Sequence, residues 1–251
     1  MCIRDRVFPI YAPMASWGDV AVGEYRPTHG YPSRSAVLGM LAAALGVTRE
    51  DEAAHAQLAD DLGMAVAVYS EGSLLRDYHT AQSTSASDLK KRPHRTRSDE
   101  LAVAKEDLHT ILSTRDYRQD AFSLVLLYHR SDAPQWTLDE LAAAIEHPCF
   151  ALFAGRKACP LALPLAPVIV EADTLMTALA ESRGQAERLL EQLGKAAIHL
   201  RYLAADTDVS AGLPLSYQVQ RKDALLSRKR WQFGDRPENV YLVQAGSEGA
   251  A

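Results

Sequence analysis

The sequence predicts an α+β fold, and three observations support this prediction. Apolar segments typical of strands and helices follow one another in the order strand, helix, strand, strand, helix. Two further strand-like segments end the chain, and 47% apolar residues among 251 are enough to build a substantial core. The order is compatible with the β-α-β-β-α-β unit of ferredoxin-like domains. We therefore expect a ferredoxin-like domain over 7–210, followed by a small β-rich portion over 211–243.

The N-terminal part of this domain is predicted to contain a strand and a buried helix. The strand covers 7–12, and a turn-rich loop over 13–30 follows it. A helix is expected over 33–45, where Ser33 can cap the N-terminus and Gly46 can end the helix in the left-handed conformation. Its interior, AVLGMLAAAL, is apolar on every side, which indicates a helix that packs closely against a sheet.

The other elements follow from the same kinds of pattern. The segment 137–148 predicts a helix, because Thr137 and Glu140 form a capping box. The segment 150–165 is irregular and contains two prolines. Further helices are expected at 50–61, 173–182 and 185–193, and strands at 64–69, 74–82, 108–113, 121–129, 198–204, 217–225 and 229–243.

Three segments differ from the rest in composition. The first six residues, MCIRDR, are charged where a buried strand would begin, so we expect an artefactual N-terminus and leave 1–6 out of the fold. Residues 83–100 are polar with almost no apolar side chain, which in a compact domain indicates a disordered or a functional segment. The C-terminal residues 244–251 are expected to be disordered.

Composition excludes several classes of protein. The three cysteines form no CxxC pair, which argues against a disulfide framework and fits a reducing cytoplasm. No apolar segment reaches the about 18–20 residues of a membrane span, and no signal peptide is visible. The sequence contains no GxxxxGK[ST] phosphate-binding loop, no HExxH zinc motif and no GxSxG nucleophile elbow. We therefore expect a cytoplasmic protein without a metal or a cofactor.

Positive charges gather in three segments, although the net charge is −5. Residues 88–97 contain five cations and one acid, 221–236 contain six cations and two acids, and Arg156 and Lys157 follow a glycine. Such clustering produces the positive face typical of nucleic-acid binding, whereas a single basic run is about as often merely solvated. Trp231 lies in the second segment and can either stack on a base or, by the strand period of two, face the core. We favour the core position.

Enzymatic chemistry has weaker support. A metal-free ribonuclease could use a histidine as general acid or base, and His29, His79 and His94 lie near basic or loop segments. Single histidines in loops are usually surface residues, and Cys149 and Cys159 are expected to behave as small apolar side chains. A third alternative is a protein-interaction scaffold whose basic segments meet acidic partners.

Four segments resemble one known family. They are YAPMASWGDVAVGEYRPTHGYPSRSAVLGMLAAALGV at 11–47, RDYHTAQ at 76–82, AGRKACPLALPL at 154–165 and LLSRKRWQF at 225–233. These motifs resemble the CasD family, which are RAMP-superfamily subunits of the type I-E CRISPR Cascade complex. The resemblance spans the chain from Val7 to Val243. The segment MCIRDR departs from the family, which has an apolar strand start there.

The resemblance implies a ferredoxin-like, RNA-recognition-like domain with a protruding thumb at about 80–112. It also implies a non-catalytic subunit that binds the 5′ handle of CRISPR RNA, caps the backbone of CasC subunits and contacts the large subunit CasA. Relatives in type I-C systems cleave RNA. A metal-independent endoribonuclease that processes CRISPR repeat RNA is therefore the alternative.

The matching motifs also suggest which residues contact RNA. Arg34 is unusual, because a cation at a helix N-terminus is disfavoured by about 0.3–1 kcal/mol. A phosphate held by Arg34, the neighbouring serines and the free backbone N–H groups would reverse that cost. The expected RNA-binding residues are Arg26, Ser33, Arg34, Ser35, Lys90, Lys91, Arg92, Arg95, Arg97, Arg156, Lys157, Arg228, Lys229, Arg230 and Trp231. No catalytic or metal-binding residue is expected.

Overall fold

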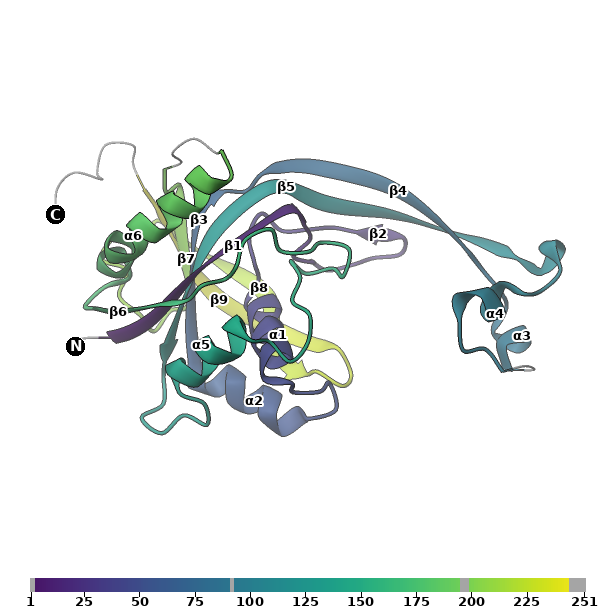
Figure 1. Ribbon diagram of the computed structural model, residues 1–251, viewed down its shortest axis with the longest axis horizontal. Coiled ribbons are helices and arrows are strands. Elements are labelled where there is room, and N and C mark those ends of the chain that lie inside the picture. The colour runs from purple at the N-terminus through teal and green to yellow at the C-terminus, as the bar shows by residue number, and fades with distance from the viewer. Residues whose placement is uncertain (1–2, 91–92, 195–198, 244–251) are drawn as a thin grey trace.

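One large, mainly antiparallel sheet runs through the body of the protein and continues into a long arm (Figure 1). The computed structural model describes residues 3–90, 93–194 and 199–243. Neighbouring strands follow the order β6-β1-β5-β3-β7-β9-β8. Their bounds are β1 Ile3–Ala15, β3 Leu62–Ser70, β5 His109–His129, β6 Val168–Ala172, β7 Tyr202–Ala205, β8 Tyr217–Ser227 and β9 Gln232–Leu242. A two-residue strand, β2 (Tyr25–Arg26), pairs parallel to β5.

The predicted fold class is confirmed. The helices α1 (Arg34–Leu45) and α5 (Leu138–Glu146) separate the strands so that β1, α1, β3, β5, α5 and β6 form the β-α-β-β-α-β unit. Its four strands lie in the order β6-β1-β5-β3, in which the first and third strands are central. Strand β6 was not among the predicted strands, and it completes the unit. The C-terminal strands extend the same sheet, because β9 pairs with β7 and β7 pairs with β3.

Both faces of the sheet are buried. One core contains Val125 and Leu127 of β5 and packs against α1, α2 (Glu52–Asp61) and α5. The other contains Leu124 and Leu126 of the same strand and packs against α6 (Leu175–Gln192), which is one helix where two were predicted. The second half of β5, residues 121–128, is therefore a nearly continuous apolar run interrupted only by Ser123, as expected for a strand covered on both sides.

The ends of the helices agree with the sequence patterns. The hydroxyl of Ser33 accepts a hydrogen bond from the backbone of Ala36, and Gly46 ends α1 with φ 77°. Thr137 and Glu140 form the predicted capping box of α5. Both helices are thus delimited by local chemistry before any tertiary contact is considered.

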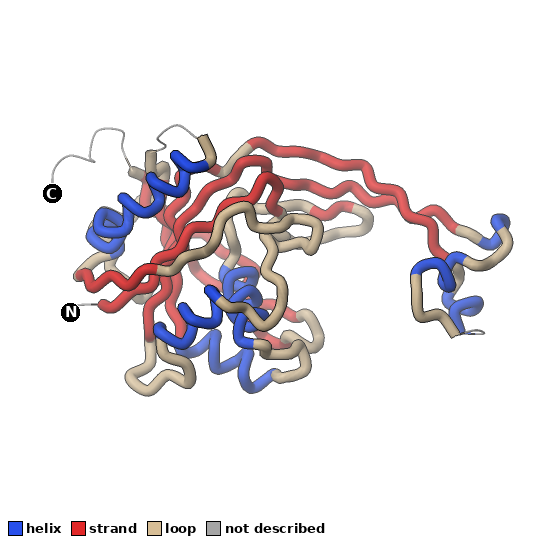
Figure 2. Tube along the Cα trace, in the orientation of Figure 1, coloured by secondary structure: helices blue, strands red, loops and turns tan. Residues whose placement is uncertain are grey.

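The arm is a two-stranded ribbon of β4 (Ser73–Ser83) and the first half of β5 (Figure 2). Pairing runs from Ser73 with Gln119 to Ser83 with His109, so the ribbon begins earlier than the predicted thumb at 80–112. The predicted strands 108–113 and 121–129 are in fact one strand of 21 residues. At the far end lie α3 (Ala86–Lys90), α4 (Arg97–Leu101) and a short 3-10 helix (Lys105–Asp107).

The first strand begins earlier than predicted. Residues from Ile3 to Arg6 pair with β6, and the side chain of Arg6 is buried and contacts the carbonyl oxygen of Leu138 and the carboxylate of Asp139. The prediction that 1–6 stand outside the fold is therefore wrong for 3–6. Residues 1–2 and the predicted disordered tail at 244–251 lie outside the described residues.

Across the three described ranges, no helix combines the length and the apolar composition that crossing a bilayer requires.

The junction between arm and body depends on Gly72, which has φ 67° and lies against the backbone of β5, where a Cβ would overlap the carbonyl oxygen of Gln119. Gly72→Ala should lower the free energy of unfolding by clearly more than Gly18→Ala, measured by chemical denaturation. Gly18 is the matched control, because it has φ 69° but open space where a Cβ would lie, so it reports only the about 1–2 kcal/mol of left-handed backbone strain. Equal losses in both variants would contradict a steric role of Gly72.

Candidate nucleic-acid interface

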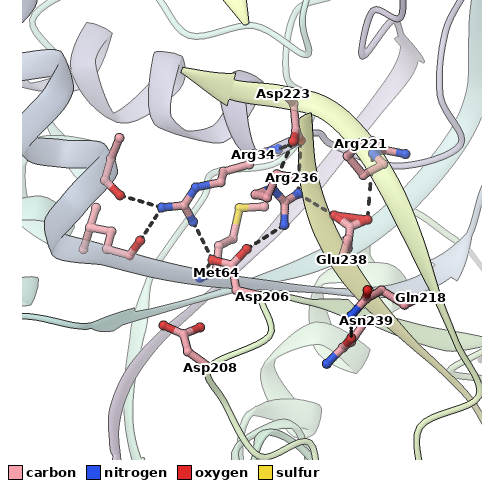
Figure 3. Close-up of polar contacts among 12 residues, drawn as sticks. Arg34, Met64, Asp206, Asp208, Gln218, Arg221, Asp223, Arg236, Glu238 and Asn239 are labelled. Atoms are coloured by element: carbon pink, nitrogen blue, oxygen red, sulfur yellow. Dashed lines mark hydrogen bonds and ion pairs between the residues drawn. The ribbon is translucent and has the colours of Figure 1, made fainter. Parts of the chain in front are cut away.

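Helix α1 begins against a cluster of charged side chains, most of them buried, which we call the buried ion network (Figure 3). It joins side chains from α1, β8, β9 and the segments that follow β5 and β7. Four guanidiniums and four carboxylates balance one another. They belong to Arg34, Arg130, Arg221, Arg236, Asp206, Asp208, Asp223 and Glu238.

Arg34 is a member of this network rather than an exposed residue. Its side chain donates to Asp206 Oδ2 at 2.5 Å and to the carbonyl oxygens of Ala59 and Leu62 at 2.7 and 2.6 Å. Only 4% of the residue is exposed. The predicted phosphate contact of Arg34 is therefore replaced by a structural role, because its donors are already satisfied inside the protein.

The anion expected at the start of α1 is present, and it comes from the protein itself. Asp223 on β8 accepts a hydrogen bond from the backbone N–H of Arg34 at 2.8 Å. A carboxylate at this position offsets the unfavourable effect of the helix dipole on a nearby cation. Ser33 and Ser35, which were predicted to share a phosphate, instead hydrogen-bond to each other at 3.2 Å. Ser33 is buried and occupied as the N-cap.

Arg236 on β9 connects the carboxylates of the network. It donates to Asp223 Oδ1 at 3.0 Å, to Asp206 Oδ1 at 2.6 Å and to Glu238 Oε1 at 2.6 Å. Burial alone would raise the pKa of Asp223, but the hydrogen bonds and charge of Arg236 outweigh burial and hold that pKa below its ordinary value. The hairpin of β8 and β9 is thereby attached to the rest of the fold by ionised side chains.

The loop before α1 joins the same network. The hydroxyl of Tyr31 donates to Glu238 Oε2 at 2.7 Å, and the Arg221 guanidinium lies over the Tyr31 ring, 4.7 Å from its centroid. One nitrogen of Arg221 lies 3.0 Å from Nδ1 of His29, and Nε2 of His29 lies 3.1 Å from Asp19. Burial, and then the charge of Arg221, lower the pKa of His29. Both ring nitrogens of this candidate histidine are occupied.

A first group of positive charges lies at the base of the arm, where Arg26 and Lys157 are exposed and Arg156 is half-buried. We call these three residues the arm-base cations. Arg156 donates to the carbonyl oxygens of Asp116 and Arg26 at 3.3 and 3.1 Å, and it lies over the Tyr117 ring, 4.7 Å from the centroid. Among the described residues, the side chain of Arg26 donates only to the carbonyl oxygens of Gly23 and Tyr25 in its own turn, at 2.6 and 3.0 Å. Carbonyl oxygens satisfy these donors without cancelling their charge.

The carboxylate of Asp116, which interacts with the charge of Arg156, is already neutralised. Asp116 accepts two hydrogen bonds from Arg76, at 2.8 and 3.1 Å, and one from the hydroxyl of Tyr25. The hydrogen bonds from Arg76 hold the pKa of Asp116 below its ordinary value, against the effect of burial. The base of the arm therefore presents surplus positive charge.

A second group lies at the turn between β8 and β9; we call Arg49, Arg228, Lys229 and Arg230 the turn cations. Arg49 donates to the carbonyl oxygens of Arg228 and Lys229 at 3.2 and 2.7 Å, which fastens the turn to the end of α1. Trp231 belongs to this turn and is 57% exposed, so the prediction that it faces the core is wrong. The turn breaks the period of two on which that prediction rested.

The predicted thumb cations are placed less favourably for binding a polyanion. Lys90, Arg95 and Arg97 are exposed at the arm tip, but Arg97 pairs with Glu100 and donates to the carbonyl oxygen of Gln82. Residues 85–108 contain six cations and five acids, so the tip is nearly neutral overall. Lys91 and Arg92 lie outside the described residues.

The sequence analysis missed one functional candidate, Arg49, and also Arg76, which neutralises Asp116 at the base of the arm. Arg49 stands among acids in the segment VTRED, and Arg76 is a lone cation in a strand. Neither shows the clustering that drew attention to the other basic segments. Figure 1 shows that β2 and the turn between β8 and β9 lie on the side of the body from which the arm projects.

Solved structures share this combination of a ferredoxin-like body and additional elements. The chain matches a structure titled "CRISPR RNA-guided surveillance complex" with a TM-score of 0.59 and 24% identity, covering 95% of this chain and 89% of the other. It matches another titled "Crystal structure of Cas protein" with a TM-score of 0.54 and 23% identity, covering 95% of each chain. The fold is thus one found among CRISPR-associated proteins.

The sequence comparison gives the family. The chain belongs to the family described as CRISPR-associated protein (Cas_Cas5), whose sequence profile matches residues 7–237. It is also 27% identical over 208 residues to the CRISPR system Cascade subunit CasD of Escherichia coli (strain K12), covering 80% of this chain and 86% of that protein. The predicted family resemblance is confirmed.

The lowered pKa of Asp223 makes stability depend on pH. As pH falls, the unfolded chain takes up the proton before the folded one, so this stabilisation is complete above about pH 5 and is lost as pH falls through the lowered folded-state pKa. Asp223→Asn should cost about 3–5 kcal/mol at pH 7, because it removes a buried carboxylate from the Arg236 guanidinium and from the start of α1, and the cost should shrink below about pH 4. Chemical denaturation across pH measures this. Asp235→Asn, at an exposed position on the same hairpin, is the control; a loss at Asp223 that is independent of pH would contradict the argument.

Proposed function

We propose that this chain is a subunit of a Cascade-type CRISPR complex and that it binds the 5′ handle of CRISPR RNA without cleaving it. In the same proposal it caps the backbone of CasC subunits, contacts CasA and works in the cytoplasm. Family membership and the similarity to a protein named as a Cascade subunit support this. The free thiols of Cys149 and Cys159 suit a reducing compartment.

The observation that carries the RNA-binding part is the surplus charge at the base of the arm. Over the described residues, no carboxylate lies within ion-pair distance of Arg26 or Arg156, whose hydrogen bonds go to carbonyl oxygens. Phosphate oxygens are stronger acceptors for a guanidinium than carbonyl oxygens are, and they would also neutralise its charge. Binding through several phosphates in this way is sequence-tolerant and sensitive to salt.

The arm suits a protein neighbour better than it suits RNA. Its tip is nearly neutral, and Leu74, Tyr78 and Ile111 are exposed along the ribbon. Exposed apolar side chains on a two-stranded ribbon are typical of a surface that another chain covers. This supports the proposed contact between the arm and the complex backbone.

The ribonuclease alternative needs a histidine with a free nitrogen close to bound RNA. His29 has both ring nitrogens occupied by Arg221 and Asp19. His79 lies on β4, 3.9 Å from Asp77, and His94 lies at the arm tip. The three candidates therefore lie on separate segments. In the described part of the chain, no group of three histidine, cysteine or acidic side chains could hold a metal ion.

Removing the arm-base cations should weaken RNA binding and reduce its salt dependence. The variant Arg26→Ala/Arg156→Ala/Lys157→Ala is expected to lower the slope of log affinity against log salt by about 2, because each lost phosphate contact contributes about 0.7. Fluorescence anisotropy with labelled repeat RNA measures both quantities. Arg188→Ala, at an exposed position of α6, is the control for the loss of one cation elsewhere on the surface and should have no effect on the slope. An unchanged slope in the triple variant would rule out this surface.

The purified chain should bind repeat RNA in EDTA without cutting it. Denaturing gel electrophoresis after long incubation tests this, with His29→Ala and His79→Ala as companions. Cleavage that disappears in either variant would establish the ribonuclease alternative instead. Crosslinking to 4-thiouridine-labelled RNA is expected for the intact chain, and its absence would favour a scaffold that binds only proteins.

A further inference from the structure

A pocket of about 360 Å³ lies between α1, the start of α2 and the turn between β8 and β9. This volume falls within the range of small-ligand sites. Ala42 and Ala43 of α1 and the ring of Phe150 form an apolar wall of the pocket. The side chains of Arg49, Arg228 and Trp231 also line it. The pocket thus combines an apolar wall, an aromatic ring and two guanidiniums.

The guanidinium of Arg228 has no ion-pair or hydrogen-bond partner among the described residues. Its guanidinium lies over the Trp231 ring, 4.5 Å from the centroid, and it reaches so close to α1 that a Cβ on Gly39 would crowd its Nη2 atom. Within the described ranges, no acceptor lies within hydrogen-bond distance of this side chain. Burial, and then the charge of Arg49, lower the pKa of Arg228. The carboxylate of Glu52 lies at the same turn, where it accepts a hydrogen bond from the backbone N–H of Lys229, but among the described residues no carboxylate forms an ion pair with Arg49 or Arg228. An anionic ligand would stabilise these two neighbouring cations.

Trp231 is the last residue of the hairpin turn between β8 and β9, and its backbone N–H donates to the carbonyl oxygen of Arg228 at 3.3 Å. Its φ of 59° lies in the left-handed region, which costs a residue with a Cβ roughly 1–2 kcal/mol. The strain does not bury the ring, since the residue is more than half exposed. Arg49 also lies over this ring, 5.1 Å from the centroid. A left-handed residue often ends a hairpin turn, so the turn accounts for this φ but not for an exposed tryptophan ring at the mouth of the pocket.

We propose that this pocket binds one nucleotide of single-stranded RNA, with its phosphate at the Arg228 and Arg49 guanidiniums and its base against Trp231 and the apolar wall. The inference rests on the proposed function and adds a nucleotide site to it. Bases of single-stranded RNA stack on aromatic rings and on guanidinium planes, and both are present here. The exposed Lys229 and Arg230 are placed next to the pocket for adjoining phosphates.

An RNA nucleotide fits these features better than an acidic protein segment does. A carboxylate would pair with the guanidiniums but would leave the apolar wall of Ala42, Ala43 and Phe150 without a partner. A nucleotide carries an anion and a flat ring in one unit, so it uses both parts of the pocket. His55 also lines the pocket, and burial and then the charge of Arg228 lower its pKa. This favours the neutral imidazole, so His55 does not add a third cation to the pocket.

The test is a titration of the full chain with a single-stranded hexauridylate, followed by tryptophan fluorescence and by anisotropy of a labelled copy. Trp231→Asn removes the ring but tolerates a positive φ, so thermal stability should be equal to or above that of the parent. Its affinity should nevertheless fall about fivefold or more. Arg228→Gln should weaken binding to a similar extent. Trp231→Phe should bind more tightly than Trp231→Asn, because an aromatic ring is retained. Lys229→Gln, next to Arg228 in sequence, should only reduce the dependence of affinity on salt.

The outcomes separate the pocket from the proposed function. If the parent binds hexauridylate and both pocket variants bind equally well, the pocket is excluded while RNA binding stands. If the parent does not bind RNA at all, both proposals fall. Polyphosphate and polyglutamate of matched charge serve as competitors. Displacement of the RNA by either at equal charge concentration would replace the nucleotide site by a simple anion or acidic-peptide site.

Discussion

The carboxylate of Asp206 is the point at which the separate parts of the fold meet. It accepts hydrogen bonds from Arg34 of α1, from Arg130 after β5 and from Arg236 of β9, and from the backbone of Met64 in β3. At 2% exposure it has almost no contact with solvent. A charge buried to this extent persists only when such partners surround it, so the helix, the sheet and the C-terminal hairpin must be in place together.

This constraint also positions the surfaces that face solvent. The hairpin of β8 and β9 is joined to α1 by Asp223 and Arg236, and its turn carries Arg228 and Trp231 over the C-terminal half of that helix. The same helix begins next to the loop that ends in Tyr31. Binding residues held by an interior of this kind need little rearrangement to meet a ligand, which favours affinity.

The sequence predicts the elements of the body well, because apolar patterns, caps and glycines act locally. It also identifies Arg34 as an anomaly, but the partner that resolves it, Asp206, is far away in the chain. No local rule connects the two. Similarly, β6 is only five residues long, and its place beside β1 follows from the tertiary fold. Trp231 was misplaced because a turn interrupts the strand pattern there.

The first half of β5 forms one strand of the arm, and its second half is a central strand of the body. Insertions in the two halves should therefore have different effects on the fold. Residues inserted at the tip, between Ser83 and His109, change the length of the arm without disturbing any pair in the body. One residue inserted near Asp120 would shift the register of the central strand and exchange its two buried faces. The arm can therefore vary in length and sequence among descendants only from its far end, while its root is under the same selection as the core.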